Sequence, residues 1–397
     1  MLRRIILVLV ILVAVAVGLW RWSESSSPQY RNAFGFLKDR IKEWYAIPLN
    51  LQFLHLPPGF EIALFAKTES PRMMAFSPGG VLLVTSESAG TVTALLDLSQ
   101  HGRVQQIVTV LSDLNGPHGI AFHNDNLYVA EITRLVRYDW DEHQLRASNP
   151  TIVVNLPETL GGHMTRTILF ANGKLYVSAG SSCNVCTEND PRRAAVSEMN
   201  EDGSGMHVFA SGLRNAVGLA FNPHTRTVWT TDNGRDWLGD DLPPDEVNDL
   251  GLGGGDFGWP FCYGNRVPDA HFGGTAERCA STVPARVELQ AHSAPLGLAF
   301  VSGPMFPAEY QDDLLVAFHG SWNRSVPTGY KVVRVKMNSQ GEPAGLEDFI
   351  TGWLPLGETH RGKWMGRPVG LVFAPDGSLY ISDDGSGSIY RVIWRGR

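Results

Sequence analysis

The chain has 397 residues, of which 43% are hydrophobic and 18% are charged, and its formal net charge is −7. The negative charge excludes a nucleic-acid-binding role that depends on a basic surface, and the hydrophobic fraction excludes a disordered chain. The 42 glycines and 24 prolines favour short strands joined by turns over long helices.

The chain begins with an apolar run. Arg3 and Arg4 precede residues 5–20, all of which are apolar. This length lies between the core of a signal peptide and a full membrane span, and the flanking Trp20 and Trp22 favour a segment that is not cleaved. We predict a transmembrane or signal-anchor helix over residues 1–22, with the rest of the chain on the periplasmic or extracellular side of the cell membrane.

A linker is predicted over residues 23–50. It starts with a polar stretch at residues 23–29 and continues into a segment in which Phe34, Leu37, Ile41 and Trp44 recur at helical spacing. This spacing predicts a short amphipathic helix.

A weak repeat runs through residues 51–397. Each copy is an apolar phrase that ends in phenylalanine, followed by a turn and a second apolar strand. The phenylalanines are Phe76, Phe122, Phe170, Phe221, Phe300 and Phe373. Their spacing of about 50 residues, rising to about 75 in the last two intervals, is typical of propeller blades with insertions near residues 235–290 and 320–365. We predict an all-β, six-bladed propeller. Two stacked β-sandwiches are the alternative, but they do not explain six copies of one phrase.

The four cysteines are Cys183, Cys186, Cys262 and Cys279. In an exported protein they can pair in three ways, and the pairs 183–186 and 262–279 close the shortest loops. The spacing of Cys183 and Cys186 would also suit a zinc site, although the other two cysteines do not match it. Two disulfides are therefore favoured.

Polar residues gather beside the repeated strands. In a propeller the loops at one end of the channel converge, so these side chains are expected to share a pocket. They are Arg72, His118, His163, Arg166, Arg214, Asn215, His292, His319, Trp322, Arg324 and Arg367. Several arginines at equivalent positions suit a planar ligand with several negative charges. For any one arginine, the alternative is an ion pair with an acid such as Asp232, Asp383 or Asp384.

An acidic loop spans residues 232–248. It combines six acids and two asparagines with a glycine near its start: Asp232, Asn233, Gly234, Asp236, Asp240, Asp241, Asp245, Glu246 and Asn248. Oxygen-rich loops suit Ca²⁺, although the spacing is not that of an EF-hand. A solvated acidic loop is the alternative.

Four motifs stand in a fixed order along the chain. They are His163-x-x-Arg166, Leu213-Arg214-Asn215, Asp245-Glu246-x-Asn248 and Phe257-Gly-Trp-Pro260. In this order they resemble the soluble glucose and aldose sugar dehydrogenases that use pyrroloquinoline quinone (PQQ). Segments 116–122, 181–186 and 320–324 are similar to the sorbosone dehydrogenase-like branch of that family. The resemblance extends from about Leu56 to the C-terminus and implies a six-bladed propeller.

The resemblance also implies a reaction. A hydride would pass from the anomeric or aldehyde carbon of a sugar or related substrate to PQQ, and Ca²⁺ would polarise the quinone. His163 would be the general base, and the backbone carbonyls of Gly234 and Arg235 would bind Ca²⁺. The residues that would bind PQQ are Arg72, His118, Arg214, Asn215, Trp322, Arg324 and Arg367. An electron acceptor, either a quinone or a cytochrome, is also implied.

Ser181 departs from the family pattern. The sugar dehydrogenases have an aspartate that supports the catalytic histidine, and Ser181 is the nearest equivalent here. Because a hydroxyl cannot stabilise an imidazolium by charge, we expect His163 to titrate with a pKa of about 6.5, that of an unassisted imidazole.

Two other functions are consistent with a propeller. A calcium-dependent lactonase-type hydrolase would need carboxylates where this chain has mainly arginines. A non-catalytic propeller that binds a protein or glycan at the cell surface would need neither the histidine nor the set of arginines. The favoured prediction is a membrane-anchored, PQQ-dependent sugar or sorbosone-type dehydrogenase.

Overall fold

The structure is a computed structural model that describes residues 51–98, 102–158 and 161–396. The predicted anchor (1–22) and linker (23–50) lie outside these residues. In the part of the chain that is described, no helix has the length and apolar character needed to cross a membrane.

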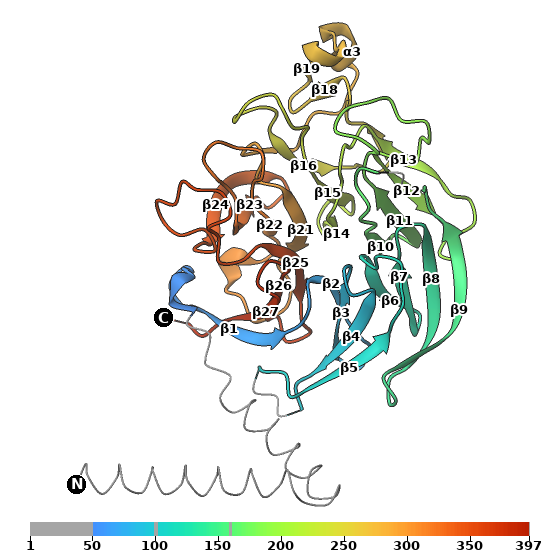
Figure 1. Ribbon diagram of the computed structural model, residues 1–397, viewed down its shortest axis with the longest axis vertical. Helices are drawn as coiled ribbons and strands as arrows, with labels where there is room; N and C mark the ends of the chain where they lie inside the picture. The colour runs from blue at the N-terminus through green and yellow to red at the C-terminus, as the bar shows by residue number, and fades with distance from the viewer. Residues whose placement is uncertain (1–50, 99–101, 159–160, 397) are drawn as a thin grey trace, which may run out of the picture. The chain divides into compact units, whose positions relative to one another are not determined.

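Six sheets of four or five strands surround a central axis within the described residues (Figure 1). The first blade contains β2 (Pro71–Phe76), β3 (Leu82–Ser86), β4 (Thr91–Leu96) and β5 (Gln106–Leu111), and the second contains β6 (Ile120–His123), β7 (Asn126–Ala130), β8 (Arg134–Asp141) and β9 (Arg146–Asn155). The third contains β10 (Ile168–Ala171), β11 (Lys174–Ala179), β12 (Ala195–Met199) and β13 (His207–Ser211).

The second half of the ring repeats this pattern. The fourth blade contains β14 (Leu219–Phe221), β15 (Val228–Asp232), β16 (Asp245–Asp249) and β20 (Val287–Leu289). The fifth contains β21 (Pro295–Phe300), β22 (Leu314–Phe318), β23 (Lys331–Met337) and β24 (Pro343–Ile350), and the sixth contains β25 (Pro368–Phe373), β26 (Leu379–Asp383), β27 (Ser388–Trp394) and β1 (Phe60–Lys67). The predicted six-bladed propeller is confirmed, and the sandwich alternative is wrong.

The ring is closed by strands from opposite ends of the described chain. β1 pairs antiparallel with β27, from Phe60 opposite Trp394 to Lys67 opposite Ser388. Phe60 then packs edge-on against Phe306 and Phe349 of the fifth blade, with ring centroids 4.8 and 5.1 Å apart. The N-terminal strand therefore completes the sixth blade and joins it to the fifth.

The apolar core lies between neighbouring blades. Trp229 of β15 is fully buried in a cluster that includes Leu298 and Phe300 of β21 and Val316 of β22. Alternating side chains of each blade thus pack on the next blade, because successive residues of a strand point to opposite faces.

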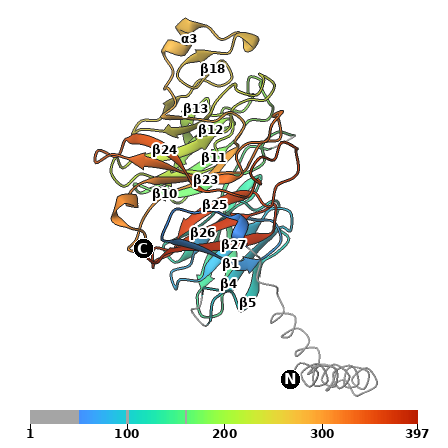
Figure 2. The ribbon, with the colours of Figure 1, turned by 90° about the vertical axis from the view of Figure 1, so that its left-hand side faces the viewer.

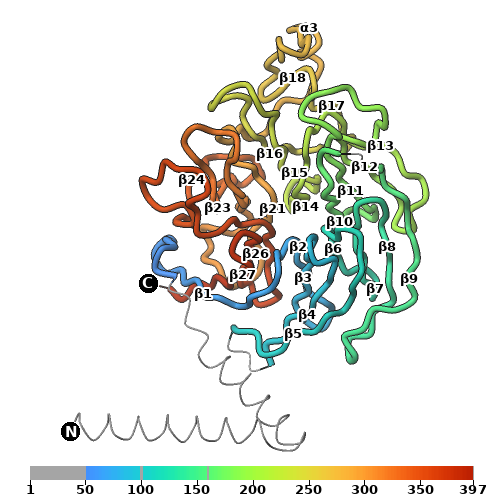
Figure 3. The backbone as a smooth tube through the Cα atoms, in the orientation of Figure 1, coloured from blue at the N-terminus to red at the C-terminus, as the bar shows by residue number. Residues whose placement is uncertain are grey.

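The inner strands β2, β6, β10, β14, β21 and β25 contact one another around the axis, as the tube trace shows (Figure 3). Glycines of the repeated phrase allow this close approach. A side chain at Gly119, Gly218 or Gly297 would collide with the backbone carbonyl of Arg166, Leu296 or Val369, respectively, in the following blade. The glycine in the sequence repeat therefore marks a contact between blades.

The fourth blade carries an insertion between β16 and β20. It contains β17 (Gly255–Asp256), β18 (Cys262–Tyr263), β19 (Val267–Pro268), the 3₁₀ turn η2 (Ala270–Phe272) and α3 (Ala276–Ala280). The predicted Cys262–Cys279 disulfide is present and joins β18 to α3. Figures 1 and 2 show this segment projecting from the edge of the ring.

The inner-strand contact can be tested with Gly218→Ala. The added methyl group has no room against the carbonyl of Leu296, so the free energy of unfolding should fall by about 1–3 kcal/mol. Urea denaturation would measure this. Gly253→Ala is the matched control, because no atom lies within 4 Å of a side chain added there. Equal stability of both variants would refute the proposed packing role of Gly218.

Candidate active site

The polar residues predicted from the sequence lie at one end of the propeller. In each antiparallel blade, the start of the inner strand and the end of the second strand meet at the same end. Arg72 lies at the start of β2, while His118, Arg166, Arg214 and Arg367 lie shortly before β6, β10, β14 and β25. Second-strand ends add the loops 180–194, 233–244 and 319–330, which follow β11, β15 and β22.

His163 is oriented by Ser181. Its Nδ1 atom lies 3.1 Å from the backbone carbonyl oxygen of Ser181 and 3.0 Å from the Ser181 Oγ atom. The Ser181 hydroxyl donates its own hydrogen to the carbonyl of Cys183 at 2.6 Å. A carbonyl can only accept, so Nδ1 carries the imidazole proton and Nε2 keeps the lone pair. Ser181 and His163 are therefore in direct contact.

The pKa of His163 differs from the expected value of about 6.5. Burial, followed by the charge of Arg214 and smaller effects of Arg193 and Arg166, lowers this pKa to about 3. The expectation considered only the loss of the aspartate and not the surrounding positive charge. The imidazole is therefore neutral at neutral pH.

Arg214 is held by the loops after β11 and β15. Its Nε and Nη2 atoms donate to the backbone carbonyl and side-chain oxygen of Asn184, both at 2.9 Å. Nη2 also lies 3.2 Å from Asp236 Oδ2, and Nη1 donates to the carbonyl of Asn233 at 3.1 Å. Asn184 was not identified from the sequence, since a lone asparagine in a loop carries no signal.

Asn215 lies beside His163. A side chain at Gly180 would collide with both the Asn215 Oδ1 atom and the His163 Cβ atom, so this glycine separates the two residues at close range. Asn215 Oδ1 is buried, and no hydrogen-bond partner for it exists within the described residues. This oxygen is available to a ligand.

Arg166 and Arg193 carry buried positive charge near His163. Arg166 is 0% exposed, and its Nη1 and Nη2 atoms donate to backbone carbonyls, among them that of Thr165 at 2.8 Å. Arg193 is also buried, and its Nε and Nη1 atoms have no hydrogen-bond partner among the described residues. Neither guanidinium pairs with a carboxylate of the described chain. Arg193 was missed because it lies outside the repeated phrase.

Arg72, His118, His319 and Asp384 form a second group. Arg72 Nη1 pairs with Asp384 Oδ2 at 2.7 Å, and His319 Nε2 lies 2.8 Å from Asp384 Oδ1. Burial lowers the pKa of His319 to about 4. Although burial opposes ionisation of Asp384, the His319 hydrogen bond and the Arg72 charge hold its pKa well below the usual range.

His118 lies beneath this group and is 0% exposed. Arg72 Nη2 lies 3.4 Å from its Nε2 atom, and Thr167 Oγ1 lies 3.2 Å from its Nδ1 atom. Because both ring nitrogens contact the protein, the geometry favours support of Arg72. Its predicted direct contact with a cofactor stays a prediction.

Arg367 is positioned by its backbone. Its amide donates to Asp383 Oδ1 at 2.7 Å, and its Nη2 atom donates to the carbonyl of Gly320 at 2.8 Å. In the same way, Asp232 accepts the backbone amides of Arg214 and Asn215. The acids Asp232 and Asp383 therefore accept backbone amides and form no ion pair with the side chains of Arg214 and Arg367.

Gly234 and Arg235 line a cavity of about 20 Å³ together with Asp232 and Glu246. The Gly234 amide donates to Asp245 Oδ1 at 2.8 Å, and Arg235 pairs with Asp269 at 2.7 Å. Burial raises the pKa of Asp245 to about 7 and raises those of Asp232 and Glu246 as well.

Arg324 and Trp322 lie in the loop after β22 and contact the loop after β15. Arg324 donates to the carbonyl of Asp240 and pairs with Asp241 Oδ1 at 3.1 Å. Trp322 is exposed and contacts Trp237. Their predicted contacts with a cofactor are untested by this arrangement.

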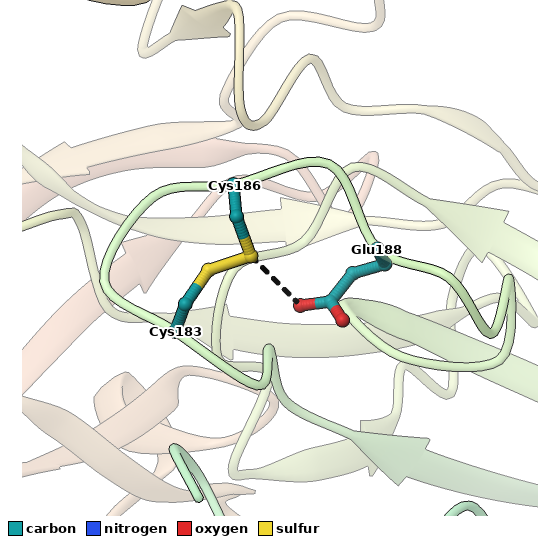
Figure 4. Close-up of side chains that lie close together, drawn as sticks. All are labelled: Cys183, Cys186 and Glu188. Carbon is teal, nitrogen blue, oxygen red and sulfur yellow. Dashed lines mark hydrogen bonds between the residues drawn. A yellow bond between two sulfur atoms is a disulfide. The ribbon is translucent and has the colours of Figure 1, made fainter.

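The second predicted disulfide, Cys183–Cys186, is present beside the site. Figure 4 shows this disulfide with Glu188, whose Oε1 atom lies 3.8 Å from the Cys186 sulfur. All four cysteines are thus in disulfides, so no thiolate is left for the alternative zinc site. The loop closed by this disulfide has two roles. The carbonyl of Cys183 accepts the Ser181 hydroxyl, and Asn184 accepts hydrogen bonds from Arg214.

Fold and site together define a six-bladed propeller in which buried arginines surround the neutral histidine His163. The chain belongs to the TrAA12-like family, whose model matches residues 54–395. It is 27% identical over 408 residues to a pyrroloquinoline quinone-dependent sugar dehydrogenase of Hypocrea jecorina, covering 86% of this chain and 90% of that protein. An uncharacterized protein of Borreliella burgdorferi is 31% identical over 357 residues, covering 86% of this chain and 91% of the relative.

A pyrroloquinoline quinone-dependent pyranose dehydrogenase of Coprinopsis cinerea is also 27% identical, over 85% of this chain but 54% of its own length. Among solved structures, the calcium structure of the Trichoderma reesei family AA12 enzyme gives a TM-score of 0.76 at 24% identity, covering 86% of this chain and 97% of the other. The holo PQQ domain of the Coprinopsis cinerea enzyme gives 0.74 at 24% identity, with the same coverage. The structural matches support the fold, and the named relatives confirm the resemblance to PQQ-dependent sugar dehydrogenases.

The titration of His163 can be followed by NMR of ¹⁵N-labelled histidine. We expect the neutral Nδ1–H form to persist on acidification until about pH 3. Because the unfolded imidazole takes up a proton near pH 6.5 and the buried one does not, this residue's contribution to stability should be lost as the pH falls from about 6.5 towards 3. His163→Gln assigns the signal, and a midpoint near 6.5 would contradict the expectation.

Proposed function

We propose that this protein oxidises the anomeric or aldehyde carbon of a sugar or related substrate, with PQQ as the hydride acceptor. The proposal is supported by the PQQ-dependent dehydrogenases among its relatives. The single observation that carries it is the excess of buried positive charge around His163. A sorbosone-type substrate is not distinguished from other sugars.

The buried charge suits PQQ, which is a planar tricarboxylate. Arg166 and Arg193 have no carboxylate partner in the described chain, and two guanidinium nitrogens of Arg193 lack a hydrogen-bond partner there. Burying unpaired charge is costly, whereas carboxylates that pair with it offset the cost. Asn215 Oδ1 adds a buried acceptor for a polar edge of the ligand.

PQQ, when bound, supplies the electrophilic carbon that accepts a hydride. His163 supplies the base: its Nε2 lone pair can take the proton of the substrate hydroxyl, while Nδ1–H stays on Ser181. Arg193 and Arg214 supply buried positive charge that would hold a bound anion in place. The backbone amides of His163 and Arg214 are held by hydrogen bonds to the Ser181 carbonyl and to Asp232, respectively.

A site for Ca²⁺ is proposed at the cavity beside Gly234 and Arg235. Asp232 and Glu246 place buried carboxylates there whose pKa values are raised by burial, and a divalent cation would stabilise their charged forms. Oxygen donors of this kind suit a hard cation, which would act as a Lewis acid on a bound quinone.

We also propose an exported, membrane-anchored location for the chain, with the propeller on the periplasmic or extracellular side. Two disulfides among the described residues are typical of an oxidising compartment. The apolar run at residues 5–20 supplies the candidate anchor. The electron acceptor would then be a quinone or cytochrome of that membrane.

The alternatives have less support. A lactonase-type hydrolase would not use the unpaired arginines. A purely binding propeller would not require the Nδ1–H form of His163 to be fixed by Ser181.

Arg193→Gln tests the cofactor site. We expect the affinity for PQQ, measured by calorimetry, to fall by about tenfold or more, since a charge-assisted hydrogen bond contributes about 1.5–3 kcal/mol. Arg192→Gln is the matched control. The Arg192 guanidinium is next to Arg193 in the sequence but is already paired with Asp190 at 2.7 Å. Wild-type protein that does not bind PQQ would reject the proposed function.

His163→Ala tests the base. Turnover of PQQ-loaded enzyme should fall by about 10²–10⁴, while PQQ affinity stays within about twofold. Dye-linked assays and the same calorimetry separate the two effects. Near-normal turnover would assign the base elsewhere, and loss of PQQ would make His163 a binding residue.

A further inference from the structure

Trp237 and Trp322 form an exposed pair at the active-site end of the propeller. Their exposed fractions are 67% and 57%, and their rings meet edge to face with centroids 5.4 Å apart and planes at 85°. Trp237 comes from the loop between β15 and β16, and Trp322 from the loop between β22 and β23. Large aromatic surfaces left in water at such a place indicate a binding surface.

The backbone holds this pair in position. Trp237 adopts a φ of +73°, in the left-handed region that bulky residues rarely occupy. Its neighbour Asp236 donates its amide to Asn184 Oδ1 at 2.8 Å and accepts from Asn323 Nδ2, the neighbour of Trp322, at 3.2 Å. Such a conformation persists only where surrounding contacts fix it, so the aromatic corner is pre-organised.

The pair is continuous with the candidate active site. Asp236 also pairs with Arg214 at 3.2 Å, and Asn184 accepts two hydrogen bonds from the same guanidinium. The Arg214 carbonyl accepts the amide of Ser181 at 2.7 Å, and Ser181 contacts His163. One continuous set of contacts therefore joins the aromatic corner to His163.

The surroundings of the pair favour a sugar. Asp240 and Asp241 lie in the same loop as Trp237, and the Asp241 side chain is 88% exposed. Carboxylates accept hydrogen bonds from hydroxyl groups, while an indole face packs against the C–H face of a pyranose ring. Arg324 pairs with Asp241, so the surface beside the indoles carries both charges and not the cluster of basic residues that binds an anionic lipid surface.

We propose that Trp237 and Trp322 form a second sugar subsite, so that the substrate is the end of an oligosaccharide rather than only a free monosaccharide. This inference rests on the proposed function, because it assumes that a sugar carbon is oxidised beside His163. The first sugar unit would lie in the pocket, and the next would stack on the aromatic corner.

Trp237→Ala tests the subsite without altering a predicted cofactor ligand. The probes are glucose and xylose, each with its β1,4-linked oligomers, and maltose with its longer α1,4-linked homologues. Calorimetry and saturation-transfer NMR measure binding to the protein, and dye-linked assays of PQQ-loaded enzyme measure turnover. We expect about tenfold weaker binding of a preferred oligomer and a tenfold higher KM for it, with the matching monosaccharide unchanged.

Two controls accompany this variant. Trp237→Phe should retain part of the affinity, because it keeps an aromatic face. Leu346→Ala removes an exposed apolar side chain on the outer strand β24 and should change nothing.

The outcomes separate the subsite from the proposed function. Monosaccharide oxidation with no advantage for any oligomer, or with oligomers unaffected by Trp237→Ala, would overturn the subsite alone. Trp237-dependent binding of oligomers without any oxidation would support the subsite and reject the dehydrogenase. Trp237-dependent binding to phosphatidylglycerol vesicles, with no effect on saccharides, would also overturn the subsite.

Discussion

Hydrogen bonds from backbone amides to buried carboxylates are the interactions on which the site depends. Asp232 fixes the amides of Arg214 and Asn215, and Asp383 fixes that of Arg367, in each case where the second strand of a blade ends beside the start of the inner strand. Because these acids accept backbone amides and form no ion pair with the neighbouring guanidiniums, Arg214 is held instead by Asn184 and Asp236, and Arg367 by the carbonyl of Gly320. The same contacts that shape the loops therefore also set the sign of the local electrostatic field.

This field has a direct effect on His163. Burial and the arginine charges make its imidazole a weak base, with a pKa of about 3. An anion bound beside Arg193 and Arg214 would offset those charges and raise the pKa, so ligand binding and base strength are coupled. Ser181 contributes orientation and fixes the proton on Nδ1, whereas charge compensation must come from the ligand.

Local patterns predicted much of the fold. The repeated phrase is visible because four of the six blades carry a glycine, such as Gly218, where the inner strand meets the next blade. The disulfides followed from short loops. β1 could not be placed in this way, because Phe60–Lys67 lies outside the repeat. In the site, His163 and Arg214 belong to motifs, but Arg193 and Asn184 act through contacts between distant loops. The pKa of His163 depends on burial and on summed charges, which no local pattern contains.

The pairing of β1 with β27 also governs when the propeller can form. These strands come from opposite ends of the described chain, and their register is set between Phe60–Lys67 and Ser388–Trp394. During synthesis the first strand waits without a partner until almost all of the chain has emerged, and its exposed edge is a site for incorrect pairing. The five other blades can assemble from neighbouring segments, but the ring closes last. We therefore expect the pairing of β1 with β27 to determine how much the protein depends on chaperones, how easily it is proteolysed and how much folded protein is obtained.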